Sequence, residues 1–331
     1  MRILLILMTF CTTLAQTLDL SKPLKPCWDR KTKANRIETA KNLILLISDG
    51  NIEALNGLGQ MVWKASDSRG QVNSALDVGN TLVVTYNSTN KTLIKFLSLT
   101  TGLSLFQKEI DSKEFQTLKL KDRLVVLSKN GIYFFDSAGS LLSKRELNFE
   151  TGIQGTVSNE YIALATPKEL LLFDSFGNIR EIRKKGLEYE IKQALFDGRR
   201  LYLSEKSGTL IAFDAETNNV AWKYRLGAAI KDMKLVDRQI VVASYDNFLY
   251  LFSKSGEVVW KKRFTDTPNI EVAADVVFAY DKNKIYAIKM SKKPKIINFI
   301  ESGEEIIKIS LVDKVLAILK QNKISGFSSD C

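Results

Sequence analysis

Short apolar runs recur along this chain at intervals close to forty residues, and this repeat constrains the fold more than any other feature. The runs begin at positions 43, 81, 124, 161, 200, 239, 276 and 315. The steps between them are 38, 43, 37, 39, 39, 37 and 39 residues. A period of this length kept along a whole chain is typical of propellers, solenoids and arrays.

Each unit contains four short strand-like segments separated by tight turns. The fifth unit shows them as IKQALFD, RLYLSE, TLIAFD and VAWKYRL, between residues 191 and 226. Segments of four to eight residues rich in Val, Ile, Leu, Tyr and Phe are typical of strands. The sequence therefore predicts an all-β fold, an eight-bladed β-propeller of four-stranded antiparallel blades, with seven blades as the alternative.

The eighth unit stops after its third segment, KISGF at 323–327, whereas residues 24–32 precede the first full unit. This N-terminal segment carries Trp28 beside a charged residue, as the fourth segments of units five and six do. We expect it to complete the last blade and close the ring. That arrangement brings Cys27 close to Cys331 and predicts a disulfide, with two unpaired thiols as the alternative.

The first residues, MRILLILMTFCTTLAQ, resemble a secretory signal peptide. An Arg, a short apolar run and a small-x-small site before Gln16 predict cleavage after residue 15 and a single propeller domain over 16–331. Lipidation at Cys11 is the alternative, although Phe10 is larger than the residue that such a site prefers. We expect an exported protein, secreted, periplasmic or associated with the outer membrane.

The composition restricts the chemistry. The chain has no histidine, which excludes a Ser-His-Asp triad and histidine-ligated zinc or haem. Its net charge is +11, and cations concentrate in the fourth segment of each unit. These are Lys64, Lys108, Lys144, Arg145, Arg183, Lys184, Lys185, Lys223, Arg225, Lys261, Lys262, Arg263, Lys292, Lys293 and Lys295. They can protect exposed strand edges, or attract an acidic partner or anionic lipid; no nucleic-acid partner is expected.

Three phrases carry a family resemblance: DGNIEALNGLGQMVWK, SGTLIAFDAETNNVAWK and DNFLYLFSKSGEVVWK. They resemble the pyrroloquinoline-quinone-like (PQQ-like) repeat, in which a tryptophan of the fourth strand packs between blades. The resemblance gives this blade-packing role to Trp63, Trp222 and Trp260, and to Trp28 in the closing segment. The same position falls on Phe106, Ser143, Ile182 and Ile297 in units two, three, four and seven.

An exported eight-bladed propeller of this repeat type is similar to the BamB family of outer-membrane protein assembly factors. The resemblance implies a non-enzymatic scaffold without a cofactor or metal, which helps to assemble outer-membrane β-barrel proteins. We expect a monomer with a protein partner, acidic or a barrel-assembly component, and at most peripheral membrane contact.

Two other functions stay open. A quinone-dependent dehydrogenase would share the repeat, but the chain has no adjacent cysteine pair and no metal-spaced carboxylate cluster. An ER-lumenal propeller, similar to the largest subunit of the ER membrane protein complex, would explain the acceptor sites NST at Asn87 and NKT at Asn90.

Overall fold

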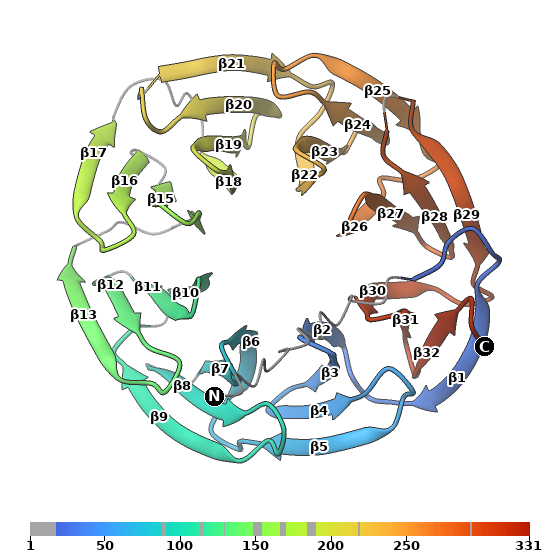
Figure 1. Ribbon diagram of the computed structural model, residues 1–331, viewed down its shortest axis with the longest axis horizontal. Coiled ribbons are helices and arrows are strands. Elements are labelled where there is room, and N and C mark those ends of the chain that lie inside the picture. Colours follow the sequence, from blue (N-terminus) through green and yellow to red (C-terminus); the bar gives the residue numbers. More distant parts are fainter. Residues whose placement is uncertain are drawn as a thin grey trace, which may run out of the picture.

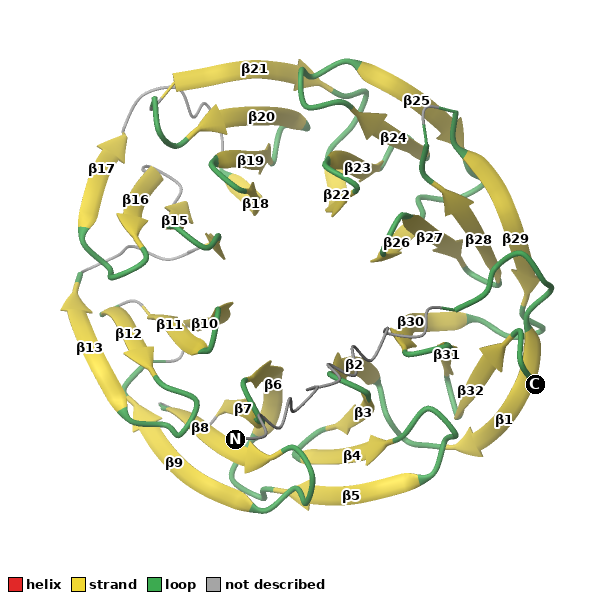
Figure 2. Ribbon diagram, viewed as in Figure 1, coloured by secondary structure: helices red, strands yellow, loops and turns green. Residues whose placement is uncertain are grey.

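The computed structural model describes residues 18–87, 91–112, 115–128, 130–147, 154–165, 170–183, 190–217, 219–291 and 293–331. Its strands form eight four-stranded antiparallel sheets, arranged as blades around a central axis (Figure 1). Within these ranges the chain consists of strands and loops only (Figure 2). The predicted signal peptide at 1–15, with Cys11, lies outside the described residues.

The first four blades follow one another along the chain. Blade 1 contains β2 (Arg36–Ala40), β3 (Leu43–Ser48), β4 (Asn51–Leu55) and β5 (Met61–Ser66). Blade 2 contains β6 (Gln71–Val78), β7 (Thr81–Asn87), β8 (Thr92–Ser98) and β9 (Ser104–Ile110). Blade 3 contains β10 (Phe115–Leu120), β11 (Arg123–Ser128), β12 (Gly131–Phe135) and β13 (Leu141–Glu146). Blade 4 contains β14 (Gln154–Val157), β15 (Tyr161–Ala165), β16 (Leu170–Asp174) and β17 (Ile179–Arg183).

The other four blades complete the ring. Blade 5 contains β18 (Ile191–Asp197), β19 (Arg200–Glu205), β20 (Thr209–Asp214) and β21 (Asn219–Arg225). Blade 6 contains β22 (Ile230–Val236), β23 (Gln239–Ser244), β24 (Phe248–Phe252) and β25 (Val258–Arg263). Blade 7 contains β26 (Asn269–Ala273), β27 (Val276–Asp281), β28 (Lys284–Lys289) and β29 (Lys295–Glu301). Blade 8 contains β30 (Ile306–Val312), β31 (Val315–Lys320), β32 (Lys323–Ser328) and β1 (Lys25–Lys31).

The prediction of eight blades is confirmed, and the seven-bladed alternative is wrong. The first strand of each of blades 1 to 7 lies nearest the axis and the fourth forms the outer wall (Figure 1). In blades 1 to 7 consecutive strands pair as hairpins, so each of these blades is a local meander of the chain.

The two ends of the chain meet in blade 8, as the sequence predicts. Its strand order is β1-β32-β31-β30, so β1 supplies the outer strand. The antiparallel register runs from Lys25 opposite Ser328 to Lys31 opposite Lys323. Cys27 and Cys331 form a disulfide across this junction, with their Cα atoms 5.4 Å apart. The ring is therefore closed by strand pairing and by a covalent bond.

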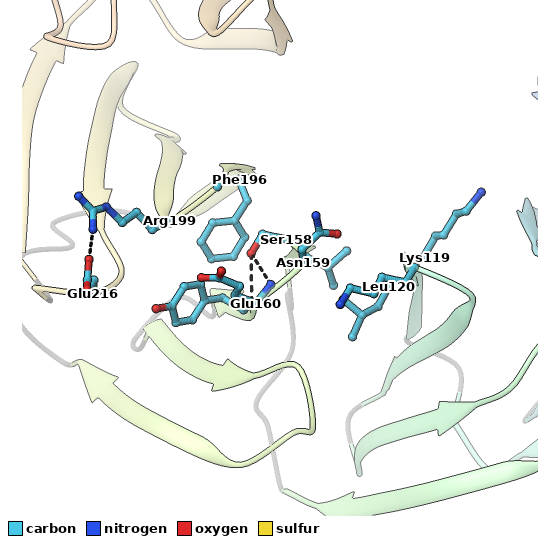
Figure 3. A pocket seen from close by; sticks show the side chains of 12 residues that line it. Lys119, Leu120, Ser158, Asn159, Glu160, Phe196, Arg199 and Glu216 are labelled. Carbon is cyan, nitrogen blue, oxygen red and sulfur yellow. Dashed lines mark hydrogen bonds and ion pairs between the residues drawn. The ribbon is translucent and has the colours of Figure 1, made fainter. Parts of the chain in front are cut away.

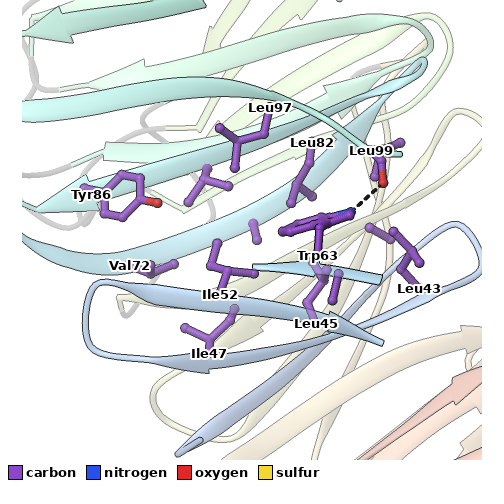
Figure 4. Close-up of a cluster of buried hydrophobic side chains, with 14 of the residues drawn as sticks. Leu43, Leu45, Ile47, Ile52, Trp63, Val72, Leu82, Tyr86, Leu97 and Leu99 are labelled. Carbon is purple, nitrogen blue, oxygen red and sulfur yellow. Dashed lines mark hydrogen bonds between the residues drawn. The ribbon is translucent and has the colours of Figure 1, made fainter. Parts of the chain in front are cut away.

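The apolar core lies between blades. The middle strands, such as β3 and β7, are buried on both faces, which explains their uninterrupted apolar sequences. Figure 4 shows the cluster between blades 1 and 2, where Leu45, Ile52 and Trp63 meet Leu82 and Leu97. A blade alone would leave these faces in water, so each repeat depends on its neighbours for burial.

Candidate functional site

The outer strand of every blade carries a bulge at the same place, and this fixes the position of the interblade aromatic. The register between the third and fourth strands shifts once in each of the eight blades. The residue at the equivalent position beside the shift is Trp63, Phe106, Ser143, Glu181, Trp222, Trp260, Asn298 and Trp28 in blades 1 to 8.

Two of the sequence assignments are therefore wrong. In blade 4 the position belongs to Glu181 rather than Ile182, because Glu181 is the residue opposite Leu172 beside the bulge. In blade 7 it belongs to Asn298 rather than Ile297, because Asn298 lies opposite Ala287. A slip of one residue along a strand moves the side chain to the other face, and only the paired register reveals where the bulge falls.

Three tryptophans make the same contact with the following blade. The indole N–H of Trp63 donates a hydrogen bond to the Leu99 carbonyl at 2.8 Å, drawn in Figure 4. Trp222 donates to the Lys254 carbonyl at 2.8 Å, and Trp28 donates to the Gly57 carbonyl at 2.9 Å. Each acceptor lies in the turn between the third and fourth strands of the next blade.

A glycine in that same turn lies against each ring. Gly102, Gly256 and Gly59 have positive φ, and a Cβ added to any of them would lie under 3.0 Å from the indole of Trp63, Trp222 or Trp28. We call this pairing the Trp–Gly contact. Phe106 makes the ring contact with Gly139 but has no N–H to donate. Trp260, partly buried, packs into the cluster between blades 6 and 7.

Charged side chains connect neighbouring blades near the axis. Glu38 on β2 accepts a hydrogen bond from the backbone N–H of Ala75 on β6 at 3.1 Å and pairs with Arg36 at 3.1 Å. Glu271 on β26 lies 3.8 Å from Lys234 and 3.9 Å from Lys308, on the inner strands on either side. Burial raises the pKa of both carboxyl groups, and the neighbouring cations oppose that shift.

A hollow of about 640 Å³ opens over blade 4, between the turns of blades 3 and 5 (Figure 3). The turn that joins β14 to β15 forms its floor, and the corresponding turns of blades 3 and 5 form its walls.

The hollow combines a stacked aromatic pair with a charged rim. Tyr161 and Phe196 are buried beneath it, with ring centroids 6.2 Å apart. On the rim, Arg199 forms an ion pair with Glu216, drawn as a dashed line in Figure 3, and Lys119 pairs with Asp77 at 2.6 Å. An aromatic base with mixed charge around it can accept a polar segment of another protein.

The hydroxyl of Ser158 in this hollow has a structural partner. It accepts hydrogen bonds from the backbone N–H groups of Glu160 and Tyr161 at 3.3 and 3.0 Å (Figure 3). Ser158 therefore stabilises the turn that forms the floor. Among the described residues, no cluster of three or more acidic or cysteine side chains could hold a metal ion.

Of the two predicted glycan acceptors, one lies within the described residues. Asn87 is exposed at the end of β7. Asn90 lies outside the described residues, as do Lys184, Lys185 and Lys292 of the predicted basic set. The described members of that set lie on or beside the outer strands, and most of them are exposed. The described part of the chain also contains no helix able to cross a bilayer.

Comparisons with known proteins find similarity to one family profile and to solved propeller structures. The profile of a family described as "Outer membrane protein assembly factor BamB" matches residues 175–313, from the turn after β16 through blade 8's first strand. Among solved structures, BamB from Moraxella catarrhalis has a TM-score of 0.69 at 14% identity, over 92% of this chain and 97% of that one. The computationally designed Ika8 protein has a TM-score of 0.77 at 13% identity, over 93% and 99%. No curated protein sequence matches.

The molecule is thus an eight-bladed β-propeller, and its repeats are similar to PQQ-like repeats. In its organisation it is similar to BamB. A propeller of this kind supports a scaffold or protein-interaction role, and a disulfide between the chain ends is typical of an oxidising compartment.

Proposed function

We propose that this chain is an exported, non-enzymatic scaffold that assists the assembly of outer-membrane β-barrel proteins. The observation that carries the proposal is the match of the BamB profile to residues 175–313 within a closed eight-bladed ring. In this proposal residues 1–15 are removed on export, and the mature chain works as a monomer in the periplasm or at the outer membrane.

The closed ring and its surface hollow are better suited to binding a partner protein than to catalysing a reaction. Trp–Gly contacts join neighbouring blades, and the disulfide joins the ends, so the ring presents its surface loops in fixed positions. The hollow over blade 4 offers a partner the aromatic pair Tyr161 and Phe196 together with the charged rim of Lys119, Arg199 and Glu216. Such a preformed surface reduces the entropy lost on binding.

A photo-cross-linking residue at Asn159 tests this role in the native host. Asn159 is exposed in the turn at the floor of the hollow, and Asn42 is exposed in the equivalent turn of blade 1 and serves as the matched control. We expect cross-links to a barrel-assembly protein from position 159 and not from position 42. Depletion of the chain should lower the amount of folded barrel protein in the outer membrane. Unchanged barrel levels, together with no cross-link from position 159, would overturn the proposal.

An ER-lumenal propeller is the second candidate. The observation that favours it is the exposed Asn87 in an N-S-T sequence at the end of β7. A glycan on native material would support that candidate.

A further inference from the structure

The described chain begins with a short segment, Leu18–Leu24, that precedes β1 and belongs to no blade. Its three leucines, Leu18, Leu20 and Leu24, pack into the apolar cluster between blades 7 and 8. Leu20 is buried, and the other two are half-buried. A segment outside the repeat thus contributes to an interface between two repeats. We call it the N-terminal segment.

A hydrogen bond from blade 7 holds this segment in place. Asn298, which lies at the aromatic position of blade 7, donates its side-chain amide to the Lys22 carbonyl at 2.8 Å. Lys22 lies six residues before Trp28, and the acceptor Gly57 lies six residues before Trp63. The N-terminal segment therefore takes the place of the turn before the fourth strand of blade 8, and Asn298 makes the tryptophan's hydrogen bond without an indole ring.

A pocket of about 670 Å³ lies beside the N-terminal segment. The apolar side chains that line it come from the segment, from blade 7 and from blade 8, and include Leu18, Leu20, Val276, Phe278, Ile297 and Leu311. Three of them, Leu20, Val276 and Phe278, are buried, and the other three are half-buried. The volume lies within the range of preformed ligand sites, and the half-buried side chains leave apolar surface open to a ligand.

Carboxylates outnumber cations around this pocket, although the net charge of the chain is +11. The charged residues that line it are Asp19, Asp275, Asp313 and Lys289. Lys289 lies 3.5 Å from Asp275 and offsets one of the three negative charges. Asp313 is exposed and forms no ion pair with a cation of the described residues. The pocket therefore combines apolar walls with a negative rim.

The pocket lies on the same face of the ring as the hollow over blade 4. It is lined by the turns that join β26 to β27 and β30 to β31, which correspond to the turns around the hollow. Corresponding turns of repeated blades lie at the same end of the ring. Blade 4 and blades 7 and 8 lie on opposite sides of the axis (Figure 1). A partner that covers this face can therefore contact both places.

The negative rim decides which occupant fits the apolar walls. It repels the anionic head groups of lipids. A second copy of this chain carries the same net charge of +11, which opposes self-association. A protein segment with an apolar side chain near a cation complements both the walls and the rim.

We propose that the pocket between blades 7 and 8 binds an extended segment of a partner protein, with an apolar side chain in the pocket and a lysine or arginine two positions away at the rim. Residues two positions apart lie on the same side of an extended chain, about 7 Å from each other. The cation can therefore reach the rim carboxylates while the apolar side chain is buried. This inference rests on the proposed scaffold role and adds the chemistry of its partner.

The test uses the oxidised mature chain and the fluorescent peptide Ser-Lys-Gly-Phe-Gly-Lys-Ser-Gly, followed by anisotropy. One control peptide has Glu in place of both lysines, and another has Ser in place of Phe. We expect each control to bind at least tenfold more weakly, and the lysine peptide to bind more weakly as salt rises. With benzoylphenylalanine in place of Phe, the peptide should cross-link to residues 18–21, 273–278 or 311–313.

Two variants of the chain test the pocket itself. Asp275→Asn with Asp313→Asn removes two rim charges. The matched control, Asp122→Asn with Asp237→Asn, removes two charges from the corresponding turns of blades 3 and 6. We expect at least a fivefold loss of affinity in the rim variant and less than a twofold loss in its control. Ala273→Leu adds apolar volume to the lining and should also weaken binding at least fivefold.

Circular dichroism and thermal unfolding of each variant check that the fold is kept; if Ala273→Leu does not fold, the rim variant and the peptides decide. Equal losses in the rim variant and its control would overturn the inference, because binding would then follow overall charge. Equal binding of the serine peptide, cross-links confined to other blades, or no binding would also overturn it. So would binding of phosphatidylglycerol vesicles, or self-association, that depends on the pocket while peptide binding does not.

The outcome separates this inference from the proposed function. If depletion lowers barrel levels but the peptide does not bind, only the pocket proposal fails. If the peptide binds as expected and barrel levels stay unchanged, the scaffold role in barrel assembly fails and the binding pocket stands.

Discussion

Trp28 donates its indole N–H to the carbonyl oxygen of Gly57 at 2.9 Å, across the junction where the two ends of the chain meet. Trp28 lies on β1, the strand that completes blade 8, and Gly57 lies in a turn of blade 1. The same contact joins blades 1 and 2 and blades 5 and 6, where the chain is continuous. Ring closure therefore uses the interblade contact of the repeat, with the disulfide added.

Replacement of Trp28 should weaken ring closure. Trp28→Ala removes both the packing on Gly59 and the hydrogen bond, and we expect a loss of about 3 kcal/mol or more in the free energy of unfolding. Trp28→Phe keeps most of the packing and should lose about 1 kcal/mol. Urea titration followed by circular dichroism measures both. If the two variants lost the same stability, the ring contact with Gly59 would contribute nothing.

The glycines of the Trp–Gly contact should be more sensitive than other glycines with positive φ. Gly102 and Gly198 both have positive φ, +70 and +59, but the surroundings of the two residues differ. A Cβ at Gly102 would lie 2.6 Å from the Trp63 ring, whereas one at Gly198 would meet nothing within 4 Å. Gly198→Ala should cost about 1–2 kcal/mol from backbone strain alone, and Gly102→Ala clearly more. Thermal unfolding of the pair measures the difference.

Loss of the disulfide should destabilise the ring without abolishing it. Cys27 and Cys331 are separated by 304 residues, and closing so long a loop stabilises a fold by about 5 kcal/mol in the chain-entropy model, an upper value. The double variant Cys27→Ser/Cys331→Ser should unfold at lower urea concentration and keep a native far-ultraviolet spectrum, because β1 stays paired with β32. The wild-type chain in reductant should behave like the variant, and a variant as stable as the oxidised chain would contradict the prediction.

Asp67 should make part of the stability depend on pH. Its carboxylate is buried and lies 2.8 Å from Arg69 and 2.5 Å from Lys95. The hydrogen bond from Arg69 first, and then that from Lys95, lower the pKa of Asp67 well below its ordinary value. Because the folded-state pKa is the lower one, the ion cluster stabilises fully above the unfolded value near 3.8 and loses this contribution as pH falls below it.

Asp67→Asn is the corresponding test. The variant should be less stable than the wild type at pH 7, and the difference should shrink as pH falls from about 4 toward the lowered pKa of Asp67. Urea titrations between pH 7 and pH 2 provide the measurement. A stability difference that stays constant over this range would show that the carboxylate charge is not responsible.

Asn87 discriminates between the two candidate functions. If the native protein comes from an ER lumen, treatment with a deglycosylating enzyme should lower its mass, and Asn87→Gln should remove that part of the shift. If the protein is bacterial and periplasmic, the native mass should equal that of the mature polypeptide with one disulfide. Asn87 is exposed, so the folded chain offers no steric obstacle to a glycan there.

The sequence by itself determined the number of blades, the strands within them and the closure of the ring. The reason is that strand patterns depend on local sequence. Because eight units are similar, a strand that is hard to recognise in one unit can be assigned from the others. It also determined which cysteines meet, because the missing fourth strand of the last unit placed Cys27 beside the end of the chain.

Only the tertiary structure decided what depends on contacts between blades. The bulges put Glu181 and Asn298, not Ile182 and Ile297, at the aromatic position, since register follows from pairing rather than from counting along the chain. The hollow over blade 4 is lined by residues of blades 3, 4 and 5 that lie far apart in the sequence, from Lys119 to Glu216. No repeat pattern records which residue lies beneath a side chain, and only the structure places Lys261 and Arg263 over the ring of Phe248.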